Sequence, residues 1–400
     1  MKTRVAQAMP TRNGFKLMAQ ERIHVGIDTH KEDYKVNLWS EIRQQSVRAW
    51  VQPSQPAILI QSLAPVRAHI ARIVYEAGPT GYQLARQLRE AGFAADVVAP
   101  SHTPKTTSPG AKCDRLDARK LAMYSAKGLL RAVAVPTLEE EADRQVVRMR
   151  EGLTKKRRRT KQQIKSLLLQ HGLGQPEDCG GDWSRAWVEA LRRMPLSPQL
   201  RLSLDLLLAE LDHLQQAVLQ AGRAVRQLAA QPRHRQAVAA LTSTPGVGPI
   251  TAMTLRTELI RPERFDNDRE LTAMLGLAPM VYSSGQTCHQ GSLMKTGNPR
   301  LRTALIEAAW RWIAKDPWAG QQFDRLQQQT GSRKKAIVAM ARRLGIILWR
   351  IDLSGQPYQP RTLDAAPEVG QPGLPDDPMP QKKGKPAKPR GLPLSVQASG

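Results

Sequence analysis

The stretch Ile23-His24-Val25-Gly26-Ile27-Asp28-Thr29-His30-Lys31 decides how the first part of the chain is expected to fold. Four of its first five residues are apolar or glycine, as in a buried strand. The strand ends on Asp28, and aspartate is disfavoured within a central strand. At a strand end, however, a carboxylate points into the crevice where α/β folds hold metals and phosphates. The stretch therefore predicts either a functional carboxylate or a polar residue that closes an ordinary strand.

Length and charge narrow the class of protein. A chain of 400 residues is expected to form two or three domains. It carries 60 Lys and Arg against 35 Asp and Glu, a net charge of +25, which indicates a polyanionic partner or a membrane surface. No apolar run approaches the roughly 18 residues of a membrane span, and the basic N-terminus lacks the apolar core of a signal peptide. Nucleic acid is therefore the expected partner, with no membrane.

The cysteines indicate the compartment. Cys113, Cys179 and Cys288 are odd in number and far apart, so they form neither a disulfide framework nor a paired zinc site. This pattern fits a reducing, cytoplasmic environment.

The sequence divides into five expected segments. The fold class is α/β followed by α: a mixed sheet with helices, then a coiled-coil stalk, then a mostly helical unit. The expected segments are a disordered basic arm (1–21), the α/β domain (22–135), the helical coiled-coil linker (136–235), the helical domain (236–350) and a disordered tail rich in Pro and Lys (351–400).

Three further acids could join Asp28. A strand over 71–76 ends on Glu76, and Asp114 and Asp117 share one face of an expected helix at positions i and i+3. Several carboxylate oxygens are what Mg²⁺ and Mn²⁺ require, and two such ions can act on one phosphate. The structural alternative for the helical pair is a solvated surface beside neighbouring arginines. An actin-like nucleotide site is disfavoured because Thr29, and not glycine, follows Asp28.

Two long helices are expected in the middle of the chain. The segment 137–171 carries six cations within seven residues, and we interpret them as phosphate contacts, with a solvated helix face as the alternative. The segment 197–230 has an apolar heptad seam from Leu200 to Leu228, which predicts a coiled coil with the first helix or with another subunit. The six cations are Lys155, Lys156, Arg157, Arg158, Arg159 and Lys161.

Near the C-terminal end, a glycine turn and a serine block stand out. The turn around Gly246 and Gly248 resembles a helix-hairpin-helix turn, whose backbone N–H groups can hold a phosphate; an ordinary helix connection is the alternative. The doublet Ser283-Ser284 precedes a glycine and could place a hydroxyl on a sharp turn, or could cap a helix. Cations that could bind phosphate follow at Lys295, Arg300 and Arg302.

Taken in order, these motifs resemble a known family. The quoted blocks are Asp28-Thr29-His30-Lys31, Tyr75-Glu76-Ala77-Gly78, Asp114-Arg115-Leu116-Asp117-Ala118, Pro245-Gly246-Val247-Gly248, and Gly276, Pro279, Ser283-Ser284-Gly285, Lys295, Gly297-Asn298 and Leu301-Arg302. Over roughly residues 22–315 the chain resembles the insertion-sequence transposases that join an N-terminal DEDD domain to a C-terminal serine transposase domain. The long tail lies outside that pattern.

The resemblance implies a ribonuclease H-like fold for the first domain, as in Holliday-junction resolvases. It implies that Asp28, Glu76, Asp114 and Asp117 are metal ligands for Mg²⁺ or Mn²⁺. The serine before the glycine would be the nucleophile; we favour Ser284 because it adjoins the glycine, and Ser283 stays open. A non-coding bridge RNA is the expected guide, so the target sequence would not be encoded in these residues.

Three functions from different classes follow. The first is a DNA recombinase that forms a phosphoserine intermediate and needs no ATP, since no P-loop motif is present. The second is a metal-dependent junction nuclease, and the third is a non-enzymatic nucleic-acid-binding protein. Because recombination joins two duplexes, a dimer or tetramer is expected. The long stalk further suggests composite active sites, with the acids and Ser284 contributed by different subunits.

Overall fold

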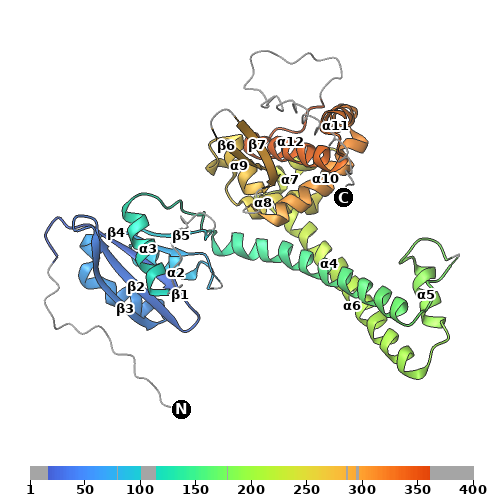
Figure 1. Cartoon of the computed structure of the whole chain (residues 1–400), viewed down its shortest axis with the longest axis horizontal. Coiled ribbons are helices and arrows are strands. Elements are labelled where there is room, and N and C mark those ends of the chain that lie inside the picture. The colour runs from blue at the N-terminus through green and yellow to red at the C-terminus, as the bar shows by residue number, and fades with distance from the viewer. Residues whose placement is uncertain are drawn as a thin grey trace, which may run out of the picture. The chain divides into compact units, whose positions relative to one another are not determined.

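The computed structural model of the chain describes residues 17–78, 80–100, 114–177, 179–284, 287–293 and 297–360 (Figure 1). The side chains of 114–116, 281–284 and 287–292 lie outside that description. The strands are β1 (Ile23–Thr29), β2 (Asp33–Ser40), β3 (Gln45–Pro53), β4 (Ile70–Glu76), β5 (Ala95–Val98), β6 (Pro279–Ser284) and β7 (Thr287–Leu293). The helices are α1 (Pro56–Leu63), η1 (Ala64–His69), α2 (Gln83–Glu90), α3 (Asp114–Ala126), α4 (Leu138–Gln170), α5 (Arg185–Arg193), α6 (Pro198–Ala229), α7 (Pro232–Thr242), α8 (Pro249–Leu259), η2 (Pro262–Arg264), α9 (Asp268–Leu275), α10 (Pro299–Lys315), α11 (Pro317–Thr330) and α12 (Arg333–Ser354).

The N-terminal sheet has the strand order β3-β2-β1-β4-β5. The strands β1, β2 and β3 form an antiparallel meander, as the short connections in the sequence predict. The strand β4 then pairs parallel with β1, and β5 pairs parallel with β4. This mixed sheet with helices on it is consistent with a ribonuclease H-like domain. Its two parallel pairs bring several strand ends to one edge of the sheet.

Alternation along β1 assigns its residues to two faces. Ile23, Val25 and Ile27 are fully buried in a cluster with residues of α1 and α2. The intervening residues face α3, whose Leu121 and Tyr124 pack in a second cluster with residues of β4 and β5. Helices therefore cover both faces of the sheet (Figure 1). This double coverage explains why the strand is apolar nearly throughout.

Helices α4 and α6 pack together as an antiparallel pair within the chain. Thr137 begins α4 with a capping box: its hydroxyl accepts from the N–H of Glu140, whose carboxylate accepts from the N–H of Thr137. The heptad seam of α6 is buried, including Leu204, Leu211 and Val225. The apolar seam of α6 therefore packs inside the chain, against α4 and, near its start, against α5.

The C-terminal part is built from α7–α12 together with one β-hairpin. Helix α12 packs against α7, α9, α10 and α11, and its Leu344 and Leu348 are fully buried. The strands β6 and β7 pair antiparallel and form a two-stranded sheet. A mostly helical unit was expected here, and the hairpin, whose β6 ends with Ser283 and Ser284, was not predicted.

Two expected boundaries differ from the structure. Glu21, expected in the basic arm, is 1% exposed and accepts from the Ser40 hydroxyl at 2.6 Å. Helix α12 continues to Ser354, past the expected boundary at 350, and Ile351 is buried. The rest of the arm and of the tail, residues 1–16 and 361–400, lies outside the described residues. Within the described part of the chain, no helix has the length and apolar character needed to cross a membrane.

Candidate acidic site and cationic surfaces

The strand ends place Asp28 and Glu76 side by side. In the parallel pair β1–β4, Ile27 lies opposite Tyr75, so the next positions along the two strands are the two acids. Neighbouring strands lie about 5 Å apart. Ile27 and Tyr75 both point into the α1–α2 side of the sheet. Asp28 and Glu76 therefore point to the opposite face, which α3 covers.

Helix α3 lies along β1 in the opposite direction. The ring nitrogen Nδ1 of His24 lies 2.9 Å from the Ser125 hydroxyl. Two residues further along β1, a Cβ on Gly26 would fall 2.1 Å from the Ala118 carbonyl oxygen, so the helix backbone touches the strand there. Because the two elements run in opposite directions, moving along β1 from Gly26 to Asp28 corresponds to moving back along α3 from Ala118 to its first turn. That turn holds Asp117.

Asp114 starts α3, and Asp117 lies three residues later on the same side of the helix. Carboxylates in a first helical turn are favoured by the helix dipole. The side chain of Asp117 is 41% exposed and lies 3.8 Å from the ammonium of Lys120. The side chain of Asp114 lies outside the described residues. The backbone thus directs the start of α3 toward the strand ends that carry the other two acids.

Asp28 has neighbours that sequence reasoning did not assign. Its Oδ2 lies 2.9 Å from Nε2 of His30, which is also 3.3 Å from the Lys35 ammonium. The same nitrogen cannot donate to the carboxylate and accept from Lys35 at once, so the tautomer selects one of these bonds. The β1–β2 register, in which Asp28 faces Lys35, produces this cluster. The tight turn between the two predicted strands was the sequence feature that could have predicted these contacts.

These residues offer oxygen ligands of the kind that hard divalent cations prefer. Asp28 is 22% exposed at its side chain, so it is held in place and still reachable. Among the side chains that the structure describes, no three His, Cys, Asp or Glu residues come together closely enough to hold a metal ion. That description omits Asp114, one of the four acids. The described acids Asp28, Glu76 and Asp117 are carboxylates, which are oxygen donors of the kind that a hard divalent cation takes.

The serine block lies on the hairpin. Ser283 and Ser284 are the last two residues of β6 and pair with Cys288 and Thr287 of β7. Their backbone is described, whereas their side chains, the residues 285–286 between the strands and Lys295 are outside the description. Ser284 is therefore the last residue of β6, opposite Thr287, and the structure does not relate its hydroxyl to the acids.

The glycine turn connects α7 to α8, as the sequence predicts. Gly246 has φ +86°, and a Cβ there would lie 2.7 Å from the Trp312 backbone nitrogen. Close packing against α10 thus requires a glycine at this position. Gly248, which precedes α8, has open space around it. Of the two glycines, only Gly246 is required by close packing.

Two of the predicted phosphate contacts have partners inside the protein. Arg300 forms an ion pair with Glu151, with 2.6 Å between Nε and Oε2. Arg302 donates from Nη1 to the Gly276 carbonyl at 3.2 Å. A Cβ on Gly297 would fall 2.2 Å from the Gly276 Cα, so the two glycines let these segments touch. These contacts give the Gly276–Arg302 block a structural role.

Glu258 forms the centre of a buried polar network. Its carboxylate is 2% exposed and accepts from Nε and Nη2 of Arg148 at 2.6 and 2.8 Å. Nδ2 of Asn298 donates to the same carboxylate at 2.8 Å, while Oδ1 of Asn298 caps α10. Burial opposes ionisation, but the bonds from Arg148 and Asn298 outweigh it and hold the pKa of Glu258 below its usual value.

Glu258→Gln is expected to destabilise the protein by about 1–3 kcal/mol near neutral pH, because Arg148 loses its charged partner. A carboxyl with a depressed pKa stabilises the fold above its unfolded pKa, and this contribution disappears as pH falls through the folded value. The wild-type protein should therefore lose stability below about pH 4.5, the ordinary glutamate value, more steeply than the variant. Urea unfolding at several pH values measures both slopes; equal slopes would contradict this account.

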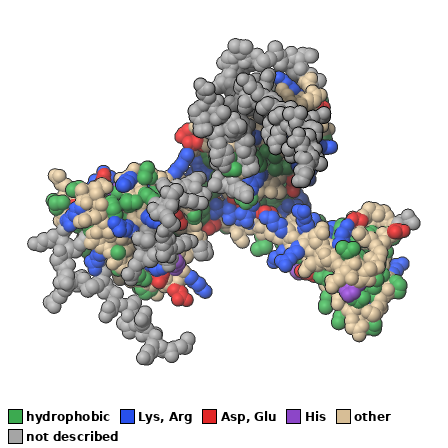
Figure 2. Space-filling model, viewed as in Figure 1, with side chains coloured by type: hydrophobic (Ala, Val, Ile, Leu, Met, Phe, Trp, Pro, Cys, Tyr) green, Lys and Arg blue, Asp and Glu red, His purple; other side chains and the backbone are tan. Residues whose placement is uncertain are grey.

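The cationic run lies in the middle of α4. Lys155 pairs with Glu151 at 2.5 Å, Arg157 donates to Gln215 at 2.6 Å, and the Lys161 ammonium lies 4.7 Å from the centroid of a Trp183 ring. The other predicted phosphate contacts of the run are exposed. They are Lys156, Arg158 and Arg159. Lys and Arg side chains gather along this part of the α4–α6 pair (Figure 2).

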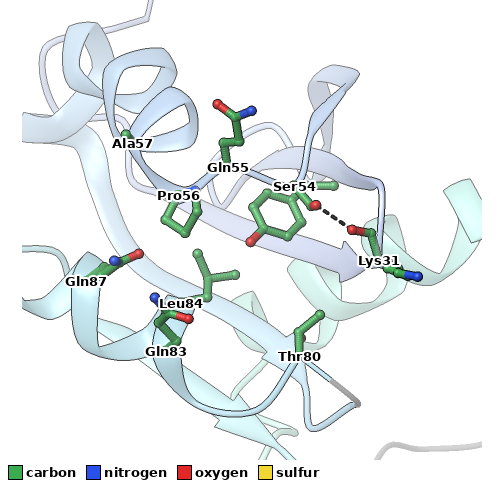
Figure 3. Close-up of a pocket in the computed structure, with 10 residues that line it drawn as sticks. Lys31, Ser54, Gln55, Pro56, Ala57, Thr80, Gln83, Leu84 and Gln87 are labelled. Carbon is green, nitrogen blue, oxygen red and sulfur yellow. Dashed lines mark hydrogen bonds between the residues drawn. The ribbon is translucent and has the colours of Figure 1, made fainter.

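A pocket of about 510 Å³ opens on the α1–α2 side of the sheet (Figure 3). The Thr80 hydroxyl and the Gln87 Oε1 are buried in its lining and lack hydrogen-bond partners among the described residues. The Ser54 hydroxyl donates to the Lys31 carbonyl at 2.6 Å at its rim. Because Asp28 faces α3, the pocket lies on the other face of the sheet and is separate from the acidic site.

Comparison with known proteins identifies the family. Residues 25–172 match a model of the DEDD domain of IS110 transposases, described as Transposase. Residues 238–324 match the model described as Transposase IS116/IS110/IS902 family. Both matches include residues quoted above: the acids lie in the first, and the serine doublet lies in the second.

Relatives that match 67–72% of the chain agree. The putative transposase y4rJ of Sinorhizobium fredii is 34% identical over 307 residues, which cover 70% of this chain and 76% of that protein. The putative transposase y4qE of the same organism is 32% identical over 298 residues, covering 72% and 71%. The transposase for insertion sequence element IS1111A of Coxiella burnetii is 25% identical over 277 residues, covering 67% and 74%. The chain therefore belongs to the IS116/IS110/IS902 family of insertion-sequence transposases.

Proposed function

We propose that this transposase cuts and rejoins DNA with four acids, Asp28, Glu76, Asp114 and Asp117, and with Ser284 as nucleophile. The observation that carries the proposal is the convergence of β1, β4 and the start of α3 at one sheet edge. A bound Mg²⁺ or Mn²⁺ would supply Lewis-acid stabilisation of charge at the phosphate. The acids would hold that cation, and the β1–β4 register, which pairs Ile27 with Tyr75, supports a place for Asp28 and Glu76 in one site.

The chemistry of Ser284 would be a phosphoryl transfer. Its oxygen forms a bond to the scissile phosphorus, the bond to the DNA sugar oxygen breaks, and the hydroxyl proton is transferred so that the sugar leaves as an alcohol. In the second step a sugar hydroxyl of the other strand attacks the phosphoserine and releases the serine. One ester replaces another throughout, so no ATP is consumed. The position of Ser284 at the end of β6 supports this role.

Covalent trapping tests the nucleophile. Wild-type protein incubated with target DNA and Mg²⁺ should give a protein–DNA adduct that survives SDS, and mass spectrometry should place it on Ser284. Ser284→Ala should lose the adduct completely, whereas Ser283→Ala should keep it. An adduct that persists in Ser284→Ala and disappears in Ser283→Ala would move the nucleophile to Ser283.

A metal-dependent nuclease that uses water is the second candidate. The observation that favours it is that all four acids belong to one sheet and the helix α3 that packs on it. A metal-dependent hydrolysis by water would need these acids and no serine. Cleavage by Ser284→Ala at the wild-type rate, with no adduct in either protein, would select this function. Metal-dependent cleavage of either kind would exclude a merely DNA-binding protein.

A guide RNA is part of the proposal. The net charge of +25 and the exposed cations of α4 support a nucleic-acid partner beyond the DNA target. If a bridge RNA pairs with the target, the protein contacts mainly backbone and shape. Purifying the protein from its host and sequencing the attached RNA tests this; RNA of random origin in the purified protein would argue against a dedicated guide.

Assembly into a dimer or tetramer is also proposed, because two DNA duplexes must meet. The seam of α6 is occupied by α4 of the same chain, so another surface has to join the subunits. The apolar side chains of Leu202 and Leu206, which are 62% and 65% exposed one turn apart on α6, are available for this. Light scattering on free and nucleic-acid-bound protein reports the oligomeric state.

Composite active sites make a measurable demand. If the acids and Ser284 of one site come from different subunits, mixing Asp117→Ala protein with Ser284→Ala protein should restore part of the strand cleavage that each variant lacks alone. Some sites in the mixture would then contain both intact parts. Tagged copies confirm that mixed oligomers form. Mixtures that assemble yet stay inactive would show that each site is built within one chain.

A further inference from the structure

A cluster of arginines lies between α4 and α6, and two of its members, Arg150 and Arg226, are not among the cations predicted from the sequence. Arg150 of α4 is half-buried, and its Nε is buried with no hydrogen-bond partner among the described residues. Arg226 of α6 stands beside it. A Cβ placed on Gly222 would lie 3.6 Å from the Arg150 Nε and 3.9 Å from the Arg226 Nη1. By the sum of these distances, the two nitrogens are no more than about 7.5 Å apart.

Arg157 extends the cluster. It lies one heptad after Arg150, on the same stripe of α4, and bonds to Gln215, which lies one heptad before Gly222 on α6. The two stripes thus run beside each other in opposite directions. Arg157 would lie about 10 Å from Arg150 along the helix axis, at 1.5 Å per residue. The result is a row of guanidinium groups along one edge of the helix pair.

The charges in this row are poorly compensated. Burial lowers the pKa of Arg150, and Arg157 and Arg226 lower it further, against the opposite effect of Glu307. Glu151, the next residue on α4, is engaged by Lys155 and Arg300. Arg226 gains some stabilisation from its place in the last turn of α6, but Arg150 is in a helix interior. Burying part of a cation beside two other cations is unfavourable, so folding alone does not explain Arg150.

We propose that Arg150, Arg157 and Arg226 form a binding site for the phosphodiester backbone of a nucleic-acid strand. Phosphate oxygens would neutralise the facing guanidinium groups, and arginine suits such contacts. The site rests on the proposed function only in that nucleic acid is bound; it does not depend on Ser284 or on metal chemistry. RNA and DNA share this ligand chemistry, and the experiment separates them.

The test compares stability and binding in the same variant, Arg150→Met. Removing an uncompensated cation and placing an apolar chain between the helices should raise the melting temperature at low salt. The same change should weaken binding about tenfold or more and reduce the slope of log K against log salt by about one. A purely structural arginine would instead lower the melting temperature and leave binding unchanged, and that result would overturn the proposal.

Controls and probes define the remaining outcomes. Arg192→Met removes an arginine that pairs with Asp212. This control should leave the salt slope unchanged and should not raise the melting temperature. Arg226→Gln, at an exposed position, repeats the binding test if Arg150→Met does not fold. Single-stranded RNA, duplex RNA and duplex DNA are titrated separately, and the probe whose affinity falls identifies the ligand. If the wild-type protein binds a probe and both variants bind it with the same affinity, this site is rejected but the proposed function is not. If the wild-type protein binds none of the probes, the proposed function is rejected as well.

Discussion

Asp28→Asn is expected to reduce strand cleavage at least about 10³-fold while leaving the protein folded. Asparagine keeps the shape of the side chain and one acceptor oxygen but loses the charge that a divalent cation needs. Loss of several kcal/mol of transition-state stabilisation corresponds to that factor, at about 1.4 kcal/mol per tenfold in rate. Single-turnover cleavage of a labelled DNA target measures it.

The same variant should bind DNA at least as tightly as the wild type, since one negative charge near a polyanion is gone. Glu32→Gln, an exposed acid in the loop after β1, serves as the matched control and should keep wild-type cleavage. If Asp28→Asn retains more than about a tenth of the wild-type rate with an unchanged melting temperature, Asp28 is a strand-end residue without a catalytic role.

The sheet was accessible to sequence reasoning because burial there is periodic. In β1, the residues that point to α1–α2 are uniformly apolar, and the strand end predicted at Asp28 lies one residue before the observed end at Thr29, so the extent of the strand is visible in the sequence. The parallel pairing of β1 with β4 then brings Glu76 to the same edge. For the first turn of α3, the only sequence evidence for a place in the site was the i, i+3 spacing of its two acids.

Other contacts depend on residues far apart in the sequence and were not visible. Arg300 was expected to contact phosphate, yet it pairs with Glu151, about half the length of the described chain away. The Arg148–Glu258 pair likewise joins α4 to α8. A cation looks the same in a sequence whether it meets a phosphate or a carboxylate, because only its neighbours in space decide.

The serine block shows a different limit. Its Ser, Gly and Thr residues suit a loop by composition, but the segment forms the antiparallel hairpin β6–β7. Strand propensity depends on what packs against the strand, so short polar strands are poorly marked in sequence. The position of Ser284 at the end of β6 therefore emerged only from the backbone, while its proposed role rests on chemistry.

Gly26→Ala is expected to disable the acidic site without touching any acid. The added Cβ would lie 2.1 Å from the Ala118 carbonyl oxygen and 2.5 Å from the Ala122 nitrogen, so α3 has to move by about 1 Å or more. Such overpacking costs about 1–3 kcal/mol or more. A misplacement of about 1 Å at a reacting group costs about 10²-fold in rate. Since α3 carries Asp117 beside the ends of β1 and β4, its displacement separates the acids.

Gly152→Ala is the matched control, because Gly152 lies within α4 and has no atom within 4 Å of an added Cβ. Alanine there should stabilise the protein by about 0.5–1 kcal/mol through its helix propensity and leave cleavage unchanged. Urea unfolding and single-turnover cleavage are measured on both variants. If Gly26→Ala cleaves DNA like Gly152→Ala, the close approach of α3 to β1 does not position the acids, and the site must be assembled in another way. If Gly26→Ala loses both stability and cleavage while Gly152→Ala loses neither, the absence of a side chain at Gly26 is what lets α3 approach β1 and β4 closely enough to bring their carboxylates into one site.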